Sequence, residues 1–232
     1  MMALRKHLRR LKTGGASDPI DRWRAKPLDR HTQKALHLLD ALNETRPLGG
    51  SIVECGVGSG YSLALFAMML DGHGDDRDLW AFDSFEGFPN GSDKDADWFS
   101  PDRMQIYKAF DVEWVRTFIG ELSGKPALAD RPRYVEGFFP STFDKYDGAP
   151  ISLLHLDVDL YQSYVDCFGF FAPLLQPGAM VLLDEYDRGT DETKWPGAKL
   201  AADEFADRHG LSIEKHFSGF VQIRVPEGLQ AR

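Results

Sequence analysis

Hydrophobic residues recur along this chain at two spacings, which together predict a regular alternation of strands and helices. Short apolar runs, typical of buried strands, occupy residues 51–55, 79–83, 133–135, 151–156 and 179–183. Stretches with an apolar residue every three or four positions, typical of amphipathic helices, occupy residues 30–42, 62–69, 111–122, 161–175 and 195–205. Two more runs, 211–217 and 219–225, predict an antiparallel hairpin that turns at Ser218–Gly219. The pattern predicts an α/β fold with a seven-stranded, mostly parallel sheet and a C-terminal antiparallel hairpin.

A single domain accounts for residues 29–232, and a polar arm precedes it at residues 1–28. A chain of 232 residues can bury one full α/β core without a second domain. The arm is basic at its start and rich in turn-forming residues. Two interpretations stay open for it: a solvated terminus, or a basic segment that contacts a membrane surface or a partner helix. With such an arm we expect a homo-oligomer.

Charge and composition argue against several classes of partner. The formal net charge is -9, whereas nucleic-acid binding needs a basic surface, so we expect no nucleic-acid partner. No apolar run approaches the roughly 20 residues of a membrane-spanning helix, and we expect no insertion into a membrane. Cys55 and Cys167 lie in apolar runs without metal-ligand spacing. We interpret them as reduced core residues of a cytoplasmic protein.

A glycine-rich turn follows the first predicted strand. Glu54 ends the strand, and Gly56, Gly58 and Gly60 follow at every second position before the next helix. Without side chains, a turn between a strand and a helix lets a ligand approach the backbone closely. A nicotinamide fingerprint would have its third glycine one residue later, where Tyr61 stands. The alternative is a glycine-rich turn that binds no ligand.

An acidic residue ends the second predicted strand. Asp83 lies about 20 residues after the glycine turn, which is the distance expected for an acid that binds a ribose diol. The alternative for this residue is a helix cap. A long polar loop, residues 87–103, follows it and contains Trp98 and Phe99. These two aromatic residues either close over an acceptor molecule or dock the loop on the body of the domain.

Four acids follow two strands that we expect to be neighbours. Asp157 and Asp159 come after one strand, and Asp184 and Glu185 come after the next. In extended chain, residues two apart project to the same side, and parallel strands end at the same edge of a sheet. Crowded carboxylates need a cation or a proton to neutralise them, and oxygen ligands suit Mg²⁺. The alternative is that these acids are helix caps or solvated loop ends. We interpret His155, in the same strand, as a core residue or a supporting residue.

Three of these stretches carry a family resemblance that extends over residues 50–225. Residues 54–60 read Glu-x-Gly-x-Gly-x-Gly, residues 83–89 read Asp-Ser-Phe-x-Gly-x-Pro, and residues 156–163 read Leu-Asp-x-Asp-Leu-Tyr-x-Ser. Together they resemble the macrocin and mycinamicin sugar O-methyltransferase family. That family is a metal-dependent branch of the class I S-adenosylmethionine (SAM) methyltransferases, which have a Rossmann-like fold. The resemblance implies methyl transfer from SAM to a sugar hydroxyl of a secondary metabolite.

The resemblance also implies roles for individual residues. Asp159 would be the general base, and Mg²⁺ would bind Asp157, Asp184 and Glu185. The family usually has two aspartates at the last pair, so Glu185 binds the metal either directly or through a water. Gly137 and Phe138 either flank the adenine or form a simple apolar turn. The SAM-binding residues would be Glu54, Gly56, Val57, Gly58, Gly60, Tyr61, Ser62, Asp83, Ser84, Gly137, Phe138 and Asp157.

The acceptor is expected to be a small molecule that carries a hydroxyl group. A catechol-like phenol or a simple saccharide would suit the metal chemistry as well as a glycosylated natural product. Two other functions remain open: a metal-dependent glycosyltransferase that uses the Asp-x-Asp acids, and a non-catalytic binding protein on the same fold. A glycosyltransferase would have no use for the glycine turn and Asp83. A non-catalytic protein would have no need for the four acids.

Overall fold

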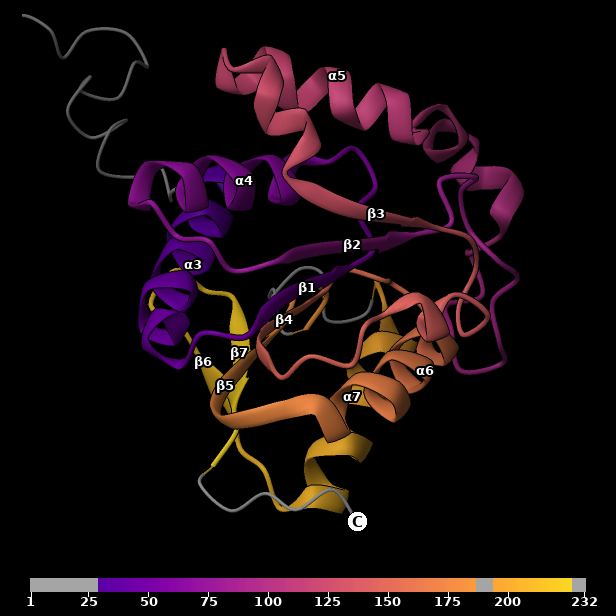
Figure 1. Ribbon diagram of the computed structural model, residues 1–232. Helices are drawn as coiled ribbons and strands as arrows, with labels where there is room; N and C mark the ends of the chain where they lie inside the picture. Colours follow the sequence, from indigo (N-terminus) through magenta and orange to yellow (C-terminus); the bar gives the residue numbers. More distant parts are fainter. Residues whose placement is uncertain (1–28, 187–193, 227–232) are drawn as a thin grey trace, which may run out of the picture.

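The strands of the protein form one sheet, which lies between two layers of helices in a computed structural model (Figure 1). The structure describes residues 29–186 and 194–226, so the predicted arm at 1–28 lies outside the described residues. The sheet order is β3-β2-β1-β4-β5-β7-β6, with β1 to β5 parallel and the last two strands antiparallel. The predicted α/β fold is thereby confirmed. The strands are β1 Ser51–Cys55, β2 Leu79–Asp83, β3 Pro132–Glu136, β4 Ile151–Leu156, β5 Leu175–Leu183, β6 Ile213–Lys215 and β7 Val221–Arg224.

Five α-helices within residues 29–186 and 194–226 cover the two faces of the sheet. α3, α4 and α5 lie on one face, and α6 and α7 lie on the other (Figure 1). Short 3-10 turns connect several of these elements. One of them, η3, begins at the end of the predicted loop 87–103 and was not predicted from the sequence. The α-helices are α3 Arg30–Thr45, α4 Tyr61–His73, α5 Val112–Ser123, α6 Tyr161–Phe171 and α7 Pro196–His209. The 3-10 turns are η2 Arg46–Leu48, η3 Pro101–Ala109, η4 Pro126–Asp130, η5 Phe143–Lys145 and η6 Ala172–Leu174.

Alternation along the central strands divides the core into two halves. In β1, Ile52 packs with the helices α3, α4 and α5, whereas Val53 and Cys55 pack on the side of α6 and α7. Because successive side chains in a strand point to opposite faces, Glu54 shares the face of Ile52. The same rule orients the acids at the strand ends, so it decides which helix each carboxylate meets.

Two predicted boundaries were wrong. The helix predicted over 161–175 ends at Phe171, and β5 begins at Leu175, before the start of the strand predicted at 179–183. Leu175 pairs with Ile151, and a register shift in β4 accommodates the extra residues before the regular part of β5. Pro177 is tolerated there because an irregular strand start does not need every ladder hydrogen bond. The closing hairpin is also shorter than predicted, with β6 and β7 covering Ile213–Lys215 and Val221–Arg224.

The strand order creates a crevice at the carboxyl edge of the sheet. The chain leaves β1 toward α4 on one face and leaves β4, its neighbour, toward α6 on the other face. Where neighbouring strands send their connections in opposite directions, the loops separate and open a ligand site. The glycine turn follows β1 and the Asp157–Asp159 turn follows β4, so both predicted motifs lie at this crevice.

Both cysteines are buried in the core as predicted. Cys55 and Cys167 are free thiols with no exposed surface, and burial raises the pKa of the Cys55 thiol well above its ordinary value. A thiol held in its neutral form is a poor nucleophile and a poor metal ligand. Among residues 29–186 and 194–226, no helix combines the length and apolar character that crossing a membrane requires.

A buried arginine, Arg77, connects the amino-terminal edge of the sheet to the end of α3 through hydrogen bonds. Arg77 donates to both carboxylate oxygens of Asp75, at 2.8 to 3.1 Å. It also donates to Thr45 Oγ1 at 3.0 Å, to Ser152 Oγ at 3.1 Å and to the carbonyl oxygen of Leu42 at 3.0 Å. The guanidinium group therefore satisfies polar groups from the end of α3, the loop before β2 and the start of β4.

Replacing this arginine is expected to destabilise the protein. Arg77→Leu should lower the free energy of unfolding by about 3–5 kcal/mol in urea denaturation, because the buried carboxylate of Asp75 loses its partner. Arg46 lies 4.0 Å from Asp75 Oδ2 and is half exposed, so it cannot replace the lost contacts. The double variant Asp75→Asn/Arg77→Leu should lose less stability than the single variant. Equal losses for the two would contradict this account of the pair.

Candidate active site

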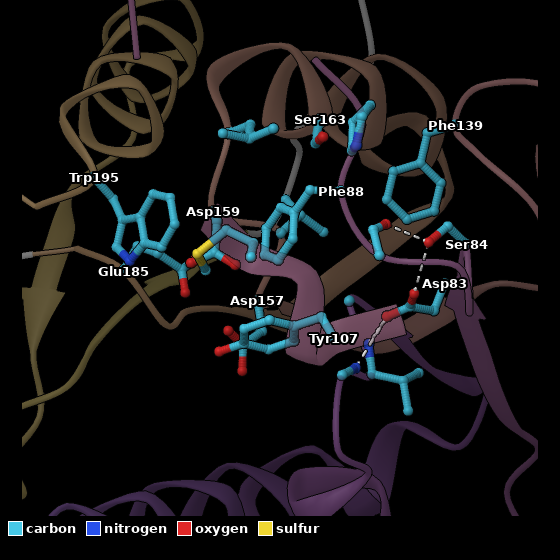
Figure 2. A pocket seen from close by; sticks show the side chains of 18 of the residues that line it. Asp83, Ser84, Phe88, Tyr107, Phe139, Asp157, Asp159, Ser163, Glu185 and Trp195 are labelled. Atoms are coloured by element: carbon cyan, nitrogen blue, oxygen red, sulfur yellow. Dashed lines mark hydrogen bonds between the residues drawn. The ribbon is translucent and has the colours of Figure 1, made fainter. Parts of the chain in front are cut away.

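A cavity of about 310 Å³ lies at the carboxyl edge of the sheet. Figure 2 shows Asp157, Asp159 and Glu185 at one end of it, near Trp195, and Asp83 and Ser84 at the other end, near Phe139. The residues that line the cavity come from α3, the glycine turn and the start of α4, the loops after β2, β3, β4 and β5, the first turns of α6, and the segments 87–110 and 194–195. The cavity therefore joins the two motifs that the sequence predicted separately.

The glycine turn forms one wall because two of its glycines permit close backbone contacts. Gly56 has φ +84°, and a Cβ atom there would lie 2.0 Å from the carbonyl oxygen of Asp157. Gly60 has φ +82°, and a Cβ atom there would lie 2.8 Å from Val115 Cγ1. At Gly58 a Cβ atom would meet only Tyr107, at 3.8 Å, on the far side of the cavity. Gly56 thus joins β1 to β4, Gly60 admits α5, and Gly58 leaves the turn open to a ligand.

Most of the predicted residues of this turn do line the cavity. They are Gly56, Val57, Gly58, Tyr61 and Ser62, with Ser59 added by the structure. Gly60 does not line it. This residue is the left-handed N-cap of α4, so its role is to start the helix and to let α5 pack closely.

Asp83 braces the glycine turn. Its Oδ2 atom accepts hydrogen bonds from the amides of Val57 at 2.7 Å and Gly58 at 3.0 Å, and its Oδ1 atom accepts from Phe85 N at 2.8 Å. The carboxylate is half buried and remains on the cavity wall. A carboxylate oxygen can accept more than one hydrogen bond, so a diol could still donate to it. The sequence predicted the acid here but not this cross-strand brace. Beside it, Ser84 lines the cavity and donates to Gly87 O at 2.5 Å.

Glu54 lies behind the cavity wall, contrary to the expectation of a direct contact with the cofactor. Its side chain has no exposed surface, and Oε1 accepts a hydrogen bond from Ser62 Oγ and lies 3.0 Å from His155 Nδ1. Glu54 shares the inner face of β1 with Ile52, so α4 covers it. Within the described part of the chain, Glu54 Oε2 is buried without a hydrogen-bond partner. The carboxylate can act on a ligand only through Ser62. His155 is a buried supporting residue, in line with the prediction.

The two candidate residues of the turn after β3, Gly137 and Phe138, differ in their position relative to the cavity. Phe138 lines the cavity together with Phe139, but Gly137 does not. Gly137 has φ +131°, donates its amide to Asp83 O at 2.9 Å, and would bring a Cβ atom to 2.6 Å from Thr142 Cγ2. This glycine therefore shapes the turn and supports β2, while the aromatic rings form the wall.

The four acids do not gather into one group, because consecutive residues at a strand end face opposite ways. Asp184 turns toward α3, where Arg30 donates to its Oδ2 atom at 2.9 Å. Glu185 turns toward α6, where its Oε2 atom accepts from Tyr164 Oη at 2.7 Å. Asp157 lies between them and belongs to two sets of possible ligands, each with atoms within 4.8 Å of one another: one with Asp159 and Glu185, the other with His155 and Asp184.

Two basic residues of α3 neutralise part of this cluster. Lys34 Nζ donates to Asp157 Oδ2 at 2.6 Å and lies 3.0 Å from Asp184 Oδ1, and the lysine side chain is 10% exposed. Arg30 reaches Asp184 from the previous turn of the helix. Neither residue was predicted from the sequence. Their signal there was the spacing of Arg30, Lys34 and His37, which places the three basic side chains on one face of the helix.

These charges give the acids different protonation tendencies. Burial would raise the pKa of Asp157, but the Lys34 ammonium, a hydrogen bond with Glu185 and the nearby His155 together outweigh burial and hold this pKa well below its usual range. Burial, reinforced by the charge of Asp157, raises the pKa of Glu185 and of Asp159 well above their usual values. Two basic side chains cannot neutralise four neighbouring carboxylates, so the remaining acids favour protons unless a further cation binds.

The donor set fits a divalent cation. Asp157, Asp159 and Glu185 offer carboxylate oxygens within 4.8 Å of one another on the cavity wall, and Mg²⁺ prefers oxygen ligands. Within the predicted set of Asp157, Asp184 and Glu185, one carboxylate lies apart from the cavity wall. Asp184 does not line the cavity, because Arg30 and Lys34 engage its carboxylate on the side of α3. Asp157 and Glu185 remain as predicted candidates.

Asp159 sits at the tip of a tight turn. Its φ is +59°, and the amide of Leu160 donates to Val158 O at 2.6 Å, so the chain reverses directly after β4. The prediction that Asp157 and Asp159 project alike from an extended strand was wrong here, because β4 ends at Leu156. A left-handed non-glycine residue is uncommon and concentrates at functional sites. The turn still brings Asp159 to the cavity beside Asp157.

Aromatic rings of the polar loop cover one side of the cavity. Phe88 stacks on Trp195 with ring centres 6.3 Å apart, and both residues line the cavity. Trp98 and Phe99 do not line it; they pack against Trp195 at 5.2 and 6.0 Å. Of the two interpretations left open by the sequence, the structure supports docking of the loop. Lys194 and Trp195, from the segment beyond β5, also line the cavity.

Known proteins similar to this chain are methyltransferases. The family model described as Macrocin-O-methyltransferase (TylF) matches residues 31–216. The 8-demethyl-8-(2,3-dimethoxy-alpha-L-rhamnosyl)-tetracenomycin-C 4'-O-methyltransferase of Streptomyces olivaceus is 33% identical over 183 residues, which cover 73% of this chain and 68% of that protein. The mycinamicin III 3''-O-methyltransferase of Micromonospora griseorubida is 29% identical over 168 residues, which cover 71% of this chain and 63% of that protein.

Solved structures of O-methyltransferases share the fold. The O-methyltransferase NovP superposes with a TM-score of 0.67 at 22% identity, covering 84% of this chain and 80% of NovP. TomG from Streptomyces achromogenes, an O-methyltransferase involved in tomaymycin synthesis and solved in complex with SAM, superposes with a TM-score of 0.51 at 17% identity. That match covers 86% of this chain and 81% of TomG. At these identities the likeness concerns the fold alone.

Alanine substitutions in the glycine turn should separate folding from ligand binding. Gly56→Ala should lower the free energy of unfolding by more than about 3 kcal/mol, because its Cβ atom would overlap the Asp157 backbone. Gly58→Ala should cost only about 1–2 kcal/mol for its left-handed φ of +51°. Since its methyl group enters the cavity, Gly58→Ala should fold and still weaken ligand binding. Urea denaturation and calorimetric titration check both expectations; equal stability of the two variants would contradict them.

Removing Lys34 should make the stability of the protein depend on divalent cations. Lys34→Met should lower the free energy of unfolding by about 3–5 kcal/mol in the presence of a chelator, because Asp157 and Asp184 lose a buried partner. Mg²⁺ should restore part of this loss by binding the folded state. Arg30→Met is the control, since Arg30 is 52% exposed and its pair should contribute less. A Lys34→Met protein as stable as the wild type in chelator would contradict the electrostatic account.

Proposed function

This chain belongs to the macrocin O-methyltransferase family, and we propose that it transfers a methyl group from SAM to a sugar hydroxyl of a glycosylated natural product. The observation that carries the proposal is the single cavity that the glycine turn and the acids share. Asp83 braces the turn at one end, and Asp157, Asp159 and Glu185 line the other end. A methyl donor and a hydroxyl acceptor need this arrangement of a nucleotide subsite beside a site for deprotonation.

The glycine end of the cavity suits the nucleoside part of SAM. The missing side chain of Gly58 leaves room for a ligand against the backbone. The carboxylate of Asp83 faces the cavity with capacity for further donors, as a ribose diol would supply. Phe138 and Phe139 offer apolar surfaces beside it, as an adenine ring requires. TomG, which shares the fold, binds SAM, and this supports the same cofactor here.

At the acid end, this chain's own residues prepare the acceptor hydroxyl. Asp157 and Glu185 would hold Mg²⁺, with Asp159 beside them. When bound, the metal supplies positive charge that lowers the pKa of the acceptor hydroxyl. Asp159, in its ionised form, takes the proton from that hydroxyl. Lys34 and Arg30 hold Asp157 and Asp184 in place.

The walls of the cavity suit a sugar acceptor. Phe88 lines the cavity with its ring stacked on the buried Trp195, and this aromatic surface can pack on the apolar face of a pyranose ring while its hydroxyl groups point to the acids. The two similar enzymes act on sugar-bearing compounds, as their names state, which supports the same class of acceptor here. Holding the hydroxyl and the methyl donor in register contributes much of the rate, up to about 7–11 kcal/mol of the barrier.

The proposal predicts that Asp159→Asn separates binding from turnover. The variant should bind SAM with the affinity of the wild type, because Asp159 lies away from the glycine turn. Its methyl transfer should fall by about 10²–10⁴-fold, since the general base is lost. Calorimetric titration with SAM measures binding, and transfer of a labelled methyl group to a panel of glycosylated acceptors measures turnover, each in Mg²⁺ and in chelator.

The control for this experiment is Asp102→Asn, which makes the same change of charge on an exposed residue of η3. It should leave both SAM binding and turnover unchanged. Near-wild-type turnover of Asp159→Asn would remove this residue from the base role. Binding of a nucleotide sugar in place of SAM would instead support a glycosyltransferase, and binding of neither compound would support a non-catalytic protein.

A further inference from the structure

We propose that Asp95 is a positioning residue for the active site. Its carboxylate joins the acidic loop, residues 87–100, to the N-terminal ends of α6 and α7 and thereby holds the turn that presents Asp159. The catalytic part of this inference rests on the function proposed above for Asp159. The structural part, a carboxylate shared between two helix ends, stands on the contacts alone.

Helix α6 has no cap of its own. Its N-cap residue, Leu160, has no side chain that can accept a hydrogen bond from the first turn. The amide of Tyr161 instead donates to Asp95 Oδ1 at 2.8 Å, from a residue 66 positions earlier in the chain. A carboxylate at this place satisfies an unpaired amide and also interacts favourably with the positive end of the helix dipole. The acidic loop thus supplies the cap that α6 lacks.

Helix α7 begins beside the same carboxylate. A Cβ atom at Gly197, in its first turn, would lie 2.1 Å from Asp95 Oδ1 and 2.9 Å from the Cβ atom of Tyr161. Only a glycine leaves room for the carboxylate at this point. The N-cap residue Trp195 makes no side-chain cap hydrogen bond either. Asp95 therefore lies where the positive ends of two helix dipoles meet.

The remaining contacts of the loop reinforce this arrangement. Asp95 Oδ2 accepts from the amide and the hydroxyl of Ser92, at 2.7 and 2.9 Å, which fixes the carboxylate within the loop. The ammonium group of Lys94 lies 3.7 Å from the centre of the Tyr161 ring. Two adjacent residues of the loop thus bind Tyr161: Asp95 accepts a hydrogen bond from its amide, and Lys94 lies over its ring.

Tyr161, which these contacts hold, lies two positions after Asp159, the proposed general base. Asp159 has a left-handed φ of +59°, and the turn around it ends at Tyr161. If the Tyr161 amide loses its partner, this turn gains freedom and the Asp159 carboxylate is no longer fixed beside Asp157. The same loop carries Trp98 and Phe99 against Trp195, so the cavity wall loosens too. Asp95 therefore acts on the reaction through other residues and does not touch the acceptor.

Turnover kinetics of two Asp95 variants test the catalytic part. Asp95→Ala should lower kcat by about 10- to 100-fold and raise KM for the acceptor, as expected when a reacting group is misplaced. The Kd for SAM should stay within about twofold of the wild type, because the glycine turn does not contact this loop residue. Asp95→Asn should restore most of kcat, since asparagine caps helices about as well as aspartate. Asp97→Ala, an exposed acid of the same loop, is the matched control and should behave as the wild type.

Hydrogen exchange of the Tyr161 amide tests the structural part without any activity. Exchange should accelerate at least about tenfold in Asp95→Ala and in Gly197→Ala, whose methyl group displaces the carboxylate, and should not change in Asp97→Ala. Unchanged exchange in both variants would overturn the proposal. So would an Asp95→Ala enzyme with wild-type kcat, or an Asp95→Asn enzyme as slow as Asp95→Ala. If the wild type transfers no methyl group at all, the proposed function fails, and the exchange rates still decide the role of Asp95.

Discussion

The site depends on one electrostatic constraint, the crowding of carboxylates where two parallel strands end. Asp157 follows β4 and Asp184 follows β5, and Lys34 bridges the two from the covering helix α3. Without this ammonium group the buried carboxylate of Asp184 and the partly buried carboxylate of Asp157 would repel each other in a medium of low dielectric constant. The position of α3 against the sheet, and with it the wall of the cavity, is therefore tied to the charge of the acids. A divalent cation would enter a cluster that the protein has already half neutralised.

Neighbouring acids in this cluster have different roles: some stabilise the structure, and others face the cavity where the chemistry would occur. Asp184 faces α3, is buried, and is engaged by Arg30 and Lys34. Glu185, its neighbour in the chain, faces α6 and the cavity, where Tyr164 donates to it. Strand alternation alone produces this difference, because adjacent side chains leave a strand on opposite faces. Glu54 provides a parallel case in β1: it ends up beneath Ser62 on the α4 side, and its action on a ligand must pass through that hydroxyl group.

Carboxylates also hold the loops around the site. Asp83 joins β2 to the glycine turn after β1, and Asp95 joins the acidic loop to the start of α6. In both cases an aspartate accepts from backbone amides that their own element leaves unpaired. The acidic character of the chain is thus partly structural. It reflects negative side chains placed at turn amides and at helix N-termini, where the backbone is positive.

The sequence by itself determined the fold class, the order of the elements and the identity of the motifs. Apolar periodicity has a range of a few residues, so it reports strands and helices directly, and the glycine turn, Asp83 and Asp157–Asp159 each lie within one short stretch. The tertiary structure alone decided which side chains meet. Lys34 lies 123 residues from Asp157, and Asp95 lies 66 residues from Tyr161. No local pattern encodes such pairs, because they arise from the packing of α3 and the acidic loop against the sheet edge. Boundaries such as the start of β5 were likewise set by pairing with a distant strand.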